Sequence, residues 1–163
     1  MLHVSRLALL AALATILTAA PAAAAGQWRP MQGRMTASVG IAADQRCGAG
    51  AVTLEFDAEA IATHLGRVTG GGTNCTEPTL ATGAVAIWDG LATYVAADGS
   101  TIFVTYAGAQ EAPVAGVATA TTHHTVVGGT GRFADAAGSW TVSGPVDFTT
   151  FSFSASFAGS ITY

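Results

Sequence analysis

The last part of the chain, residues 151–163, alternates between two kinds of side chain. Its odd-numbered positions carry Phe, Ala, Gly, Ile or Tyr, and its even-numbered positions carry Ser, Thr or Ala. Successive side chains of a β-strand point to opposite faces, so this segment predicts a strand with one apolar face and one hydroxyl-rich face. A long, one-sided final strand suits a sheet that closes on itself, because closure removes the exposed edge.

Short strand-like segments separated by turn signals fill the rest of the chain. We expect strands over residues 31–39, 51–56, 60–69, 80–88, 91–96, 101–106, 115–127, 139–143 and 148–163, with turns at 57–59, 70–74, 89–90 and 98–99. Strands at this spacing with almost no helix are typical of a sandwich or a barrel. We therefore predict an all-β fold, a closed antiparallel barrel of about eight strands, whose interior is filled or holds one small ligand.

The N-terminal residues have the pattern of a secretory signal peptide. A short region with His3 and Arg6 precedes an apolar run, and an alanine tract ends at Ala25, where small residues favour cleavage. A retained membrane anchor is the alternative, but the apolar run is short for a spanning helix. We expect a signal peptide over 1–25, a single domain over 26–163, and a secreted or periplasmic protein.

The two cysteines, Cys47 and Cys75, both lie in the part expected to be exported. Export implies an oxidising compartment, so we interpret them as one disulfide. Two free thiols or a pair of metal ligands are the alternatives, and no ligand spacing supports them.

A glycine-rich turn precedes the last two strands, and we expect its role to be structural. It contains Gly128, Gly129, Gly131, Arg132, Phe133, Asp135 and Gly138. We expect Asp135 to cap a helical turn and Arg132 to pair with a carboxylate or to bind carbonyl groups. The turn lacks the lysine of a phosphate-binding loop.

This turn, with its Gly-Gly-Thr-Gly-Arg-Phe run, an Ala-Gly step and a Phe-rich final strand, resembles the calycin-like barrels of allene oxide cyclase and dirigent proteins. Together with the 62–67 run and the Asp98-Gly99-Ser100 hairpin, it also resembles small exported bacterial proteins of unassigned activity. The resemblance implies the barrel fold. Allene oxide cyclases bind an oxylipin and dirigent proteins steer phenoxy-radical coupling, but no catalytic residue of either family is matched here.

Charge and histidine spacing exclude several functions. The formal net charge is −4 and every basic residue is an arginine, so no basic patch for nucleic acid is visible. His123 and His124 must point to opposite faces of a strand, so at most one joins His64 in the interior. We expect no metal and no cofactor. His64 and Glu55 are weak candidates for acid–base catalysis, and Glu55 is expected to be solvated.

Aromatic residues on the predicted strands could line a ligand cavity, although ordinary core packing is the alternative. The candidates are Trp88, Tyr94, Phe103, Tyr106 and Trp140. We predict an exported, non-catalytic barrel that binds a small apolar ligand. The alternatives are a cyclase or isomerase acting on a lipid-derived substrate and, less favoured, an outer-membrane barrel. We expect no membrane association after signal cleavage, and oligomeric association remains open.

Overall fold

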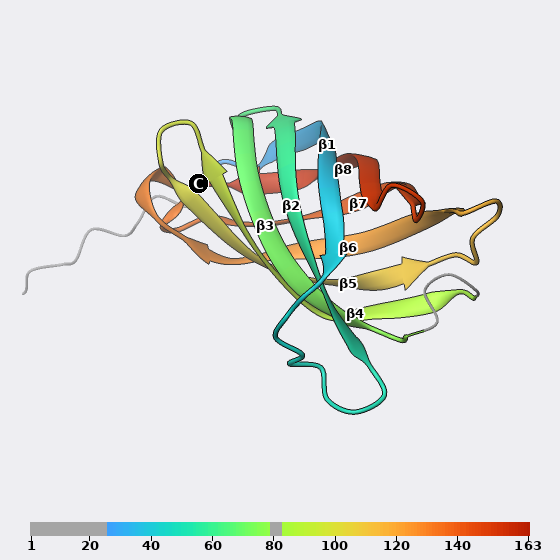
Figure 1. The fold of residues 1–163 in the computed structure, drawn as a ribbon. Coiled ribbons are helices and arrows are strands. Elements are labelled where there is room, and N and C mark those ends of the chain that lie inside the picture. Colours follow the sequence, from blue (N-terminus) through green and yellow to red (C-terminus); the bar gives the residue numbers. More distant parts are fainter. Residues whose placement is uncertain (1–25, 79–82) are drawn as a thin grey trace, which may run out of the picture.

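The computed structural model describes residues 26–78 and 83–163, and the expected signal peptide lies outside these residues. Eight antiparallel strands follow one another around a closed barrel, and the last strand pairs with the first (Figure 1). The all-β barrel predicted from the sequence is confirmed. The strands are β1 (Arg29–Ile41), β2 (Val52–Ala62), β3 (Gly66–Thr76), β4 (Val85–Ala96), β5 (Thr101–Gln110), β6 (Val117–Gly129), β7 (Ala137–Asp147) and β8 (Ser152–Thr162).

The apolar face of each strand points into the barrel. In β8, Ala155, Phe157 and Ile161 are buried, whereas the serines between them are exposed or half-buried. The same two-residue alternation of burial runs through most of β5 and β6. The core is therefore the barrel interior itself. Within the described residues, no helix has the length and apolar character needed to cross a membrane.

Two predicted turns lie inside strands instead. Residues 57–59 belong to β2, because their acidic side chains alternate with buried alanines and simply face the solvent. The chain actually reverses after Ala62, where His64 has a φ of 66° and Gly66 has a φ of 72°. The glycines at 70–72 likewise belong to β3.

Residues 89–90, also predicted as a turn, form an irregularity within the continuous strand β4. The pairing of β4 with β5 shifts between Ile87 and Gly90, and Asp89 has a φ of 51°. The start of the strand expected at 80–88 lies partly outside the described residues. The turn predicted at Asp98-Gly99 is confirmed, with a φ of 83° at Gly99.

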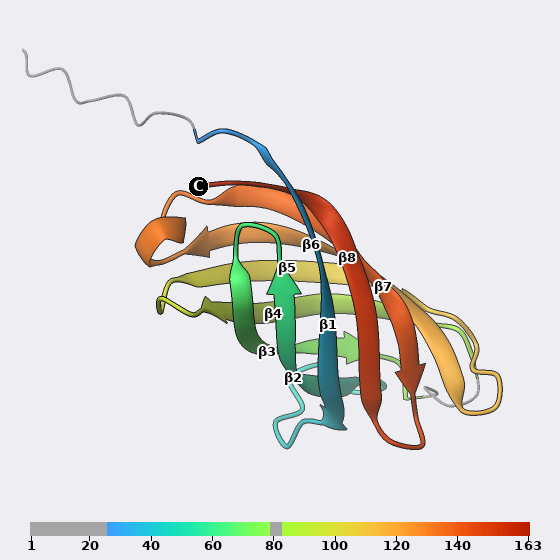
Figure 2. The ribbon, with the colours of Figure 1, turned by 90° about the horizontal axis from the view of Figure 1, so that it is seen from above.

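One end of the barrel is closed by the glycine-rich turn. Its single turn of 3-10 helix, η1 (Gly131–Phe133), lies at the same end as the C-terminus (Figure 2). Phe133 is completely buried, and its ring meets the ring of Tyr163 with centroids 5.0 Å apart. This turn therefore acts as a plug, and the prediction of a structural role fits its position.

Arg132 holds the plug in place, as expected from the sequence. Its guanidinium pairs with Asp98 at 3.2 Å and donates a hydrogen bond to the Leu65 carbonyl at 3.3 Å. Asp135, by contrast, follows η1 and is exposed, so it does not cap the helix. Thr130 occupies the N-cap position, without a side-chain capping bond.

The disulfide between Cys47 and Cys75 is present, with Cα atoms 5.5 Å apart. It ties the loop between β1 and β2 to the outside of β3. Arg46, in the same loop, pairs with Asp89 and hydrogen-bonds to the side chain of Thr73. The loop is thus fastened across two neighbouring strands.

Candidate functional site

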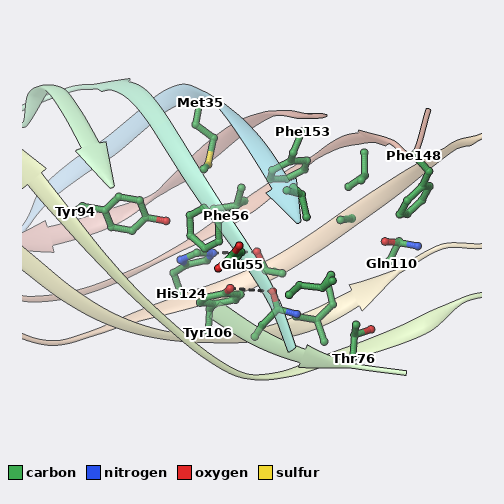
Figure 3. Close-up of a pocket in the computed structure, with 18 residues that line it drawn as sticks. Met35, Glu55, Phe56, Thr76, Tyr94, Tyr106, Gln110, His124, Phe148 and Phe153 are labelled. Carbon is green, nitrogen blue, oxygen red and sulfur yellow. Dashed lines mark hydrogen bonds between the residues drawn. The ribbon is translucent and has the colours of Figure 1, made fainter. Parts of the chain in front are cut away.

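A cavity of about 90 Å³ lies in the half of the barrel opposite the plug. Most of its wall is apolar, including Met35, Phe56, Ile87, Val142, Phe148 and Phe153. In Figure 3, Tyr94 lies toward one end of the group of lining side chains, and Phe148 and Gln110 lie toward the other. A cavity needs a volume of only about 10–15 Å³ to hold one water molecule, so this cavity has room for a small organic molecule.

Several buried polar side chains interrupt the apolar wall. Thr76, Gln110 and Thr122 lie there, and Tyr106 donates a hydrogen bond from its hydroxyl to Asn74 Oδ1 at 3.0 Å. Burial raises the pKa of the Tyr106 hydroxyl, with a smaller contribution from Tyr94. An apolar cavity with a few placed polar groups is the usual form of a small-molecule site.

His124 is the only buried histidine among the described residues, at 4 % exposed. Its ring stacks on Tyr106, with centroids 4.7 Å apart, and on Trp140, with centroids 5.6 Å apart. Burial lowers the pKa of the imidazole to about 4, and the neighbouring His123 adds to this effect. The ring is therefore neutral at pH 7.

One ring nitrogen of His124 is satisfied and the other is not. Nε2 lies 3.0 Å from the hydroxyl oxygen of Thr122, whereas Nδ1 is buried without a hydrogen-bond partner in the described structure. Depending on the tautomer, Nδ1 can accept or donate one hydrogen bond. An unpaired buried polar atom is costly, so a ligand that bonds to it would gain more than it would at an exposed atom.

Tyr94 reaches the cavity because a glycine faces it across the sheet. Gly70 pairs with Tyr94, and a Cβ atom at Gly70 would lie only 2.4 Å from the tyrosine ring. The Tyr94 hydroxyl makes no hydrogen bond within the described residues, and burial raises its pKa. It is thus a neutral hydroxyl group available to a ligand.

The five aromatic candidates from the sequence separate into three groups. Tyr94 and Tyr106 line the cavity, and Trp140 lies deeper, where it lines a void of about 20 Å³. Phe103 is 38 % exposed on the outer face of β5, and Trp88 is half-buried at the position paired with Cys75. Phe103 and Trp88 therefore do not contribute to the cavity wall. Phe103 lies on the outer face of β5 because side chains alternate along a strand, and its neighbours Ile102 and Val104 point inward.

The two weak catalytic candidates do not come together. His64 is exposed in the turn between β2 and β3, at the closed end of the barrel. Glu55 is exposed at the other end, beside the mouth of the cavity. No acid–base pair is formed by these residues.

Sequence reasoning missed His124, Asn74 and Gln110 as lining residues. Alternation does place Thr122 and His124 on the same face as the buried Ala118 and Ala120, which is a usable signal. Asn74 gave no such signal, because a register shift between Thr73 and Cys75 interrupts the pairing of β3 with β4.

Neither a protein-family model nor a curated protein sequence matches this chain. Two solved structures of pterocarpan synthase dirigent proteins are similar to it. The first has a TM-score of 0.51 and 15 % identity, over 84 % of this chain and 96 % of that one. The second has a TM-score of 0.52 and 16 % identity, over 91 % and 98 %. At such identity the likeness concerns the fold, and the chain has a dirigent-like eight-stranded barrel.

Proposed function

We propose that this protein is an exported, non-catalytic barrel that binds a small, mostly apolar molecule in its cavity. The observation that carries the proposal is the apolar cavity with His124, whose buried Nδ1 is unpaired, among its lining residues. The hydroxyl of Tyr94 supplies a second group that can fix the orientation of a ligand.

Export is supported by the disulfide and by the signal-like N-terminal sequence. The secreted or periplasmic location is part of the proposal. The inward-facing apolar residues favour a water-surrounded barrel over an outer-membrane barrel, whose apolar band faces the lipid.

A cyclase or isomerase acting on a lipid-derived substrate is the second candidate, since both allene oxide cyclases and dirigent proteins were suggested by the sequence. One observation favours it: His124 is a buried ionisable group in the cavity wall. Against it, His64 and Glu55 are both exposed and far from forming a site. A pKa near 4 also makes His124 a weak base at neutral pH.

Native mass spectrometry of the mature protein, purified from its host's exported fraction, tests the binding proposal. The variant Ala120→Leu places a larger side chain in the cavity wall, because Ala120 is buried there. The matched control is Ala107→Leu, at an exposed position on the outer face of β5. We expect a small-molecule adduct on the wild type and on Ala107→Leu, and none on Ala120→Leu.

An adduct that survives equally in Ala120→Leu would place the ligand outside the cavity and contradict the proposal. Turnover of the released molecule by wild-type protein, lost in His124→Phe, would instead support the cyclase or isomerase.

A further inference from the structure

The barrel interior holds a second, smaller hollow beside the candidate ligand cavity. This hollow, which we call the inner void, has a volume of about 20 Å³, against about 90 Å³ for the cavity. It lies toward the plugged end, because Leu65 in the turn between β2 and β3 is one of its lining residues. Among the described residues that line it, Tyr94 and Trp140 carry polar atoms, and the other side chains are hydrocarbon or thioether groups.

Met35 and Tyr94 separate the inner void from the cavity. Among the described residues, these two side chains are the ones that line both spaces. Met35 belongs to β1 and Tyr94 to β4, and these strands are not neighbours, so the two side chains enter the interior from separate walls. Figure 3 shows both in the part of the cavity away from Phe148 and Gln110. We call this pair the partition.

The two members of the partition differ in their freedom to move. The ring of Tyr94 lies against Gly70, where even a Cβ atom would be only 2.4 Å from it, and such close packing restricts the ring. Met35 pairs instead with Ala60 on β2 and Ala155 on β8, whose side chains are small and buried. Methionine also has three rotatable bonds. Met35 is therefore the adjustable member of the partition.

The inner void suits the end of an apolar chain. A buried water needs two to four polar partners, and a hollow walled largely by hydrocarbon groups does not provide them. Its volume is that of roughly one or two water-sized spheres, which is enough for the end of a chain and too small for a ring. The hydrogen-bonding side chains of Asn74, Thr122 and His124 line the cavity instead. An amphiphile would therefore keep its polar group in the cavity and direct its tail toward the partition.

We propose that Met35 sets the longest aliphatic tail that the cavity accepts, because it keeps the tail of the ligand out of the inner void. This inference rests on the proposed binding function. It adds a specificity-determining residue and a class of ligand, an amphiphile with one unbranched apolar tail. Methylene groups in excess of the cavity length must then stay in water, where they add little to the affinity.

A series of unbranched alcohols from butan-1-ol to decan-1-ol tests the length limit. Calorimetric titrations of the wild-type protein would give the dissociation constant of each alcohol. Each methylene group buried on binding should tighten binding by about fourfold. We expect the affinity to rise at this rate for the shorter alcohols and then to level off within the series.

The variant Met35→Ala removes the adjustable member of the partition and joins the cavity to the inner void. It should move the levelling-off point to an alcohol about two carbons longer, so the affinity ratio between the longest and shortest alcohols should rise by at least about tenfold. Met31→Ala is the matched control, because Met31 is also buried in β1 and lines the inner void but not the cavity. It enlarges the void behind an intact partition and should leave the length limit unchanged.

Loss of a buried methionine side chain destabilises a protein, so Met35→Val and Met31→Val provide a milder pair that should show the same contrast. Circular dichroism would check that each variant is folded. A steady rise in affinity through decan-1-ol in the wild type, an unchanged limit in the folded Met35 variants, or an equal extension in the Met31 variants would overturn the role of Met35 while leaving the binding function intact. If none of the alcohols binds to the wild type, the binding function itself fails.

Discussion

Tyr106 and His124 stack face to face inside the barrel, with their ring centroids 4.7 Å apart and their planes 6° from parallel. Trp140 covers the other face of the imidazole. The hydroxyl of Tyr106 is held by Asn74, so the ring that supports His124 is itself fixed. The buried histidine is therefore kept neutral and in one orientation by aromatic neighbours.

Acidification should destabilise the protein through His124. Its pKa is about 4 in the folded protein and about 6.5 in the unfolded chain, so the unfolded chain binds the proton more readily. The free energy of unfolding is therefore unaffected by this group above pH 6.5. It falls by about 3 kcal/mol as the pH decreases toward 4. Urea denaturation followed by circular dichroism at pH 7, 5 and 4 measures this loss.

The variant His124→Phe should flatten that pH dependence between 6.5 and 4, because it removes the titrating group but retains a planar ring. His64→Asn, at an exposed histidine in the turn between β2 and β3, is the control and should keep the wild-type slope. An unchanged slope in His124→Phe would show that another group is responsible.

Removing the hydroxyl group from each of the two cavity tyrosines should have different effects on the stability of the protein. Tyr106→Phe leaves the buried Asn74 without its partner and should cost about 1–3 kcal/mol of unfolding free energy. Tyr94→Phe removes a buried hydroxyl that has no hydrogen bond in the described structure, so the unfolding free energy should stay the same or rise. Chemical denaturation of both variants tests the difference, and equal losses would contradict it.

Gly70→Ala should damage the site from the neighbouring strand. The new Cβ would lie 2.4 Å from the Tyr94 ring and 2.6 Å from the Thr93 carbonyl oxygen, which demands a shift of the ring or the strand. Overpacking of this kind costs about 1–3 kcal/mol. Gly83→Ala is the control, since nothing lies within 4 Å of its Cβ position. The melting temperatures of both variants test this, and a stable Gly70→Ala would argue against the close packing of Tyr94.

The plug should be a major contributor to stability. Phe133→Ala removes a completely buried ring and should cost about 3–5 kcal/mol. Phe103→Ala makes the same change on the outer face of β5, where the ring is 38 % exposed, and should cost much less. Equilibrium unfolding of the pair would measure the difference, and similar losses would show that the plug is not needed to close the barrel.

The sequence predicts the architecture well because alternation carries most of the information. The two faces of β8 and the pairing of Cys47 with Cys75 could both be read from residue types and compartment. Turn positions were less accurate, because charged residues and glycines were taken as chain breaks. In the barrel, the acids at positions 57 and 59 face the solvent, and Gly70 and Gly72 make room for the interior side chains of Tyr94 and Ala92 on β4.

The site was only partly predictable. Tyr94 and Tyr106 lie on inward faces that alternation identifies, but the same pattern does not distinguish an open cavity from a filled core.

The central claim is that a small ligand enters the barrel and reaches His124. The most direct measurement is a nitrogen-15 NMR titration of the imidazole ring nitrogens with hexan-1-ol, assigned with His124→Phe. The account predicts that the Nδ1 and Nε2 signals of His124 move saturably, while those of the exposed His64 and His123 do not. Saturable binding with no change at His124, or changes confined to the exposed histidines, would contradict it.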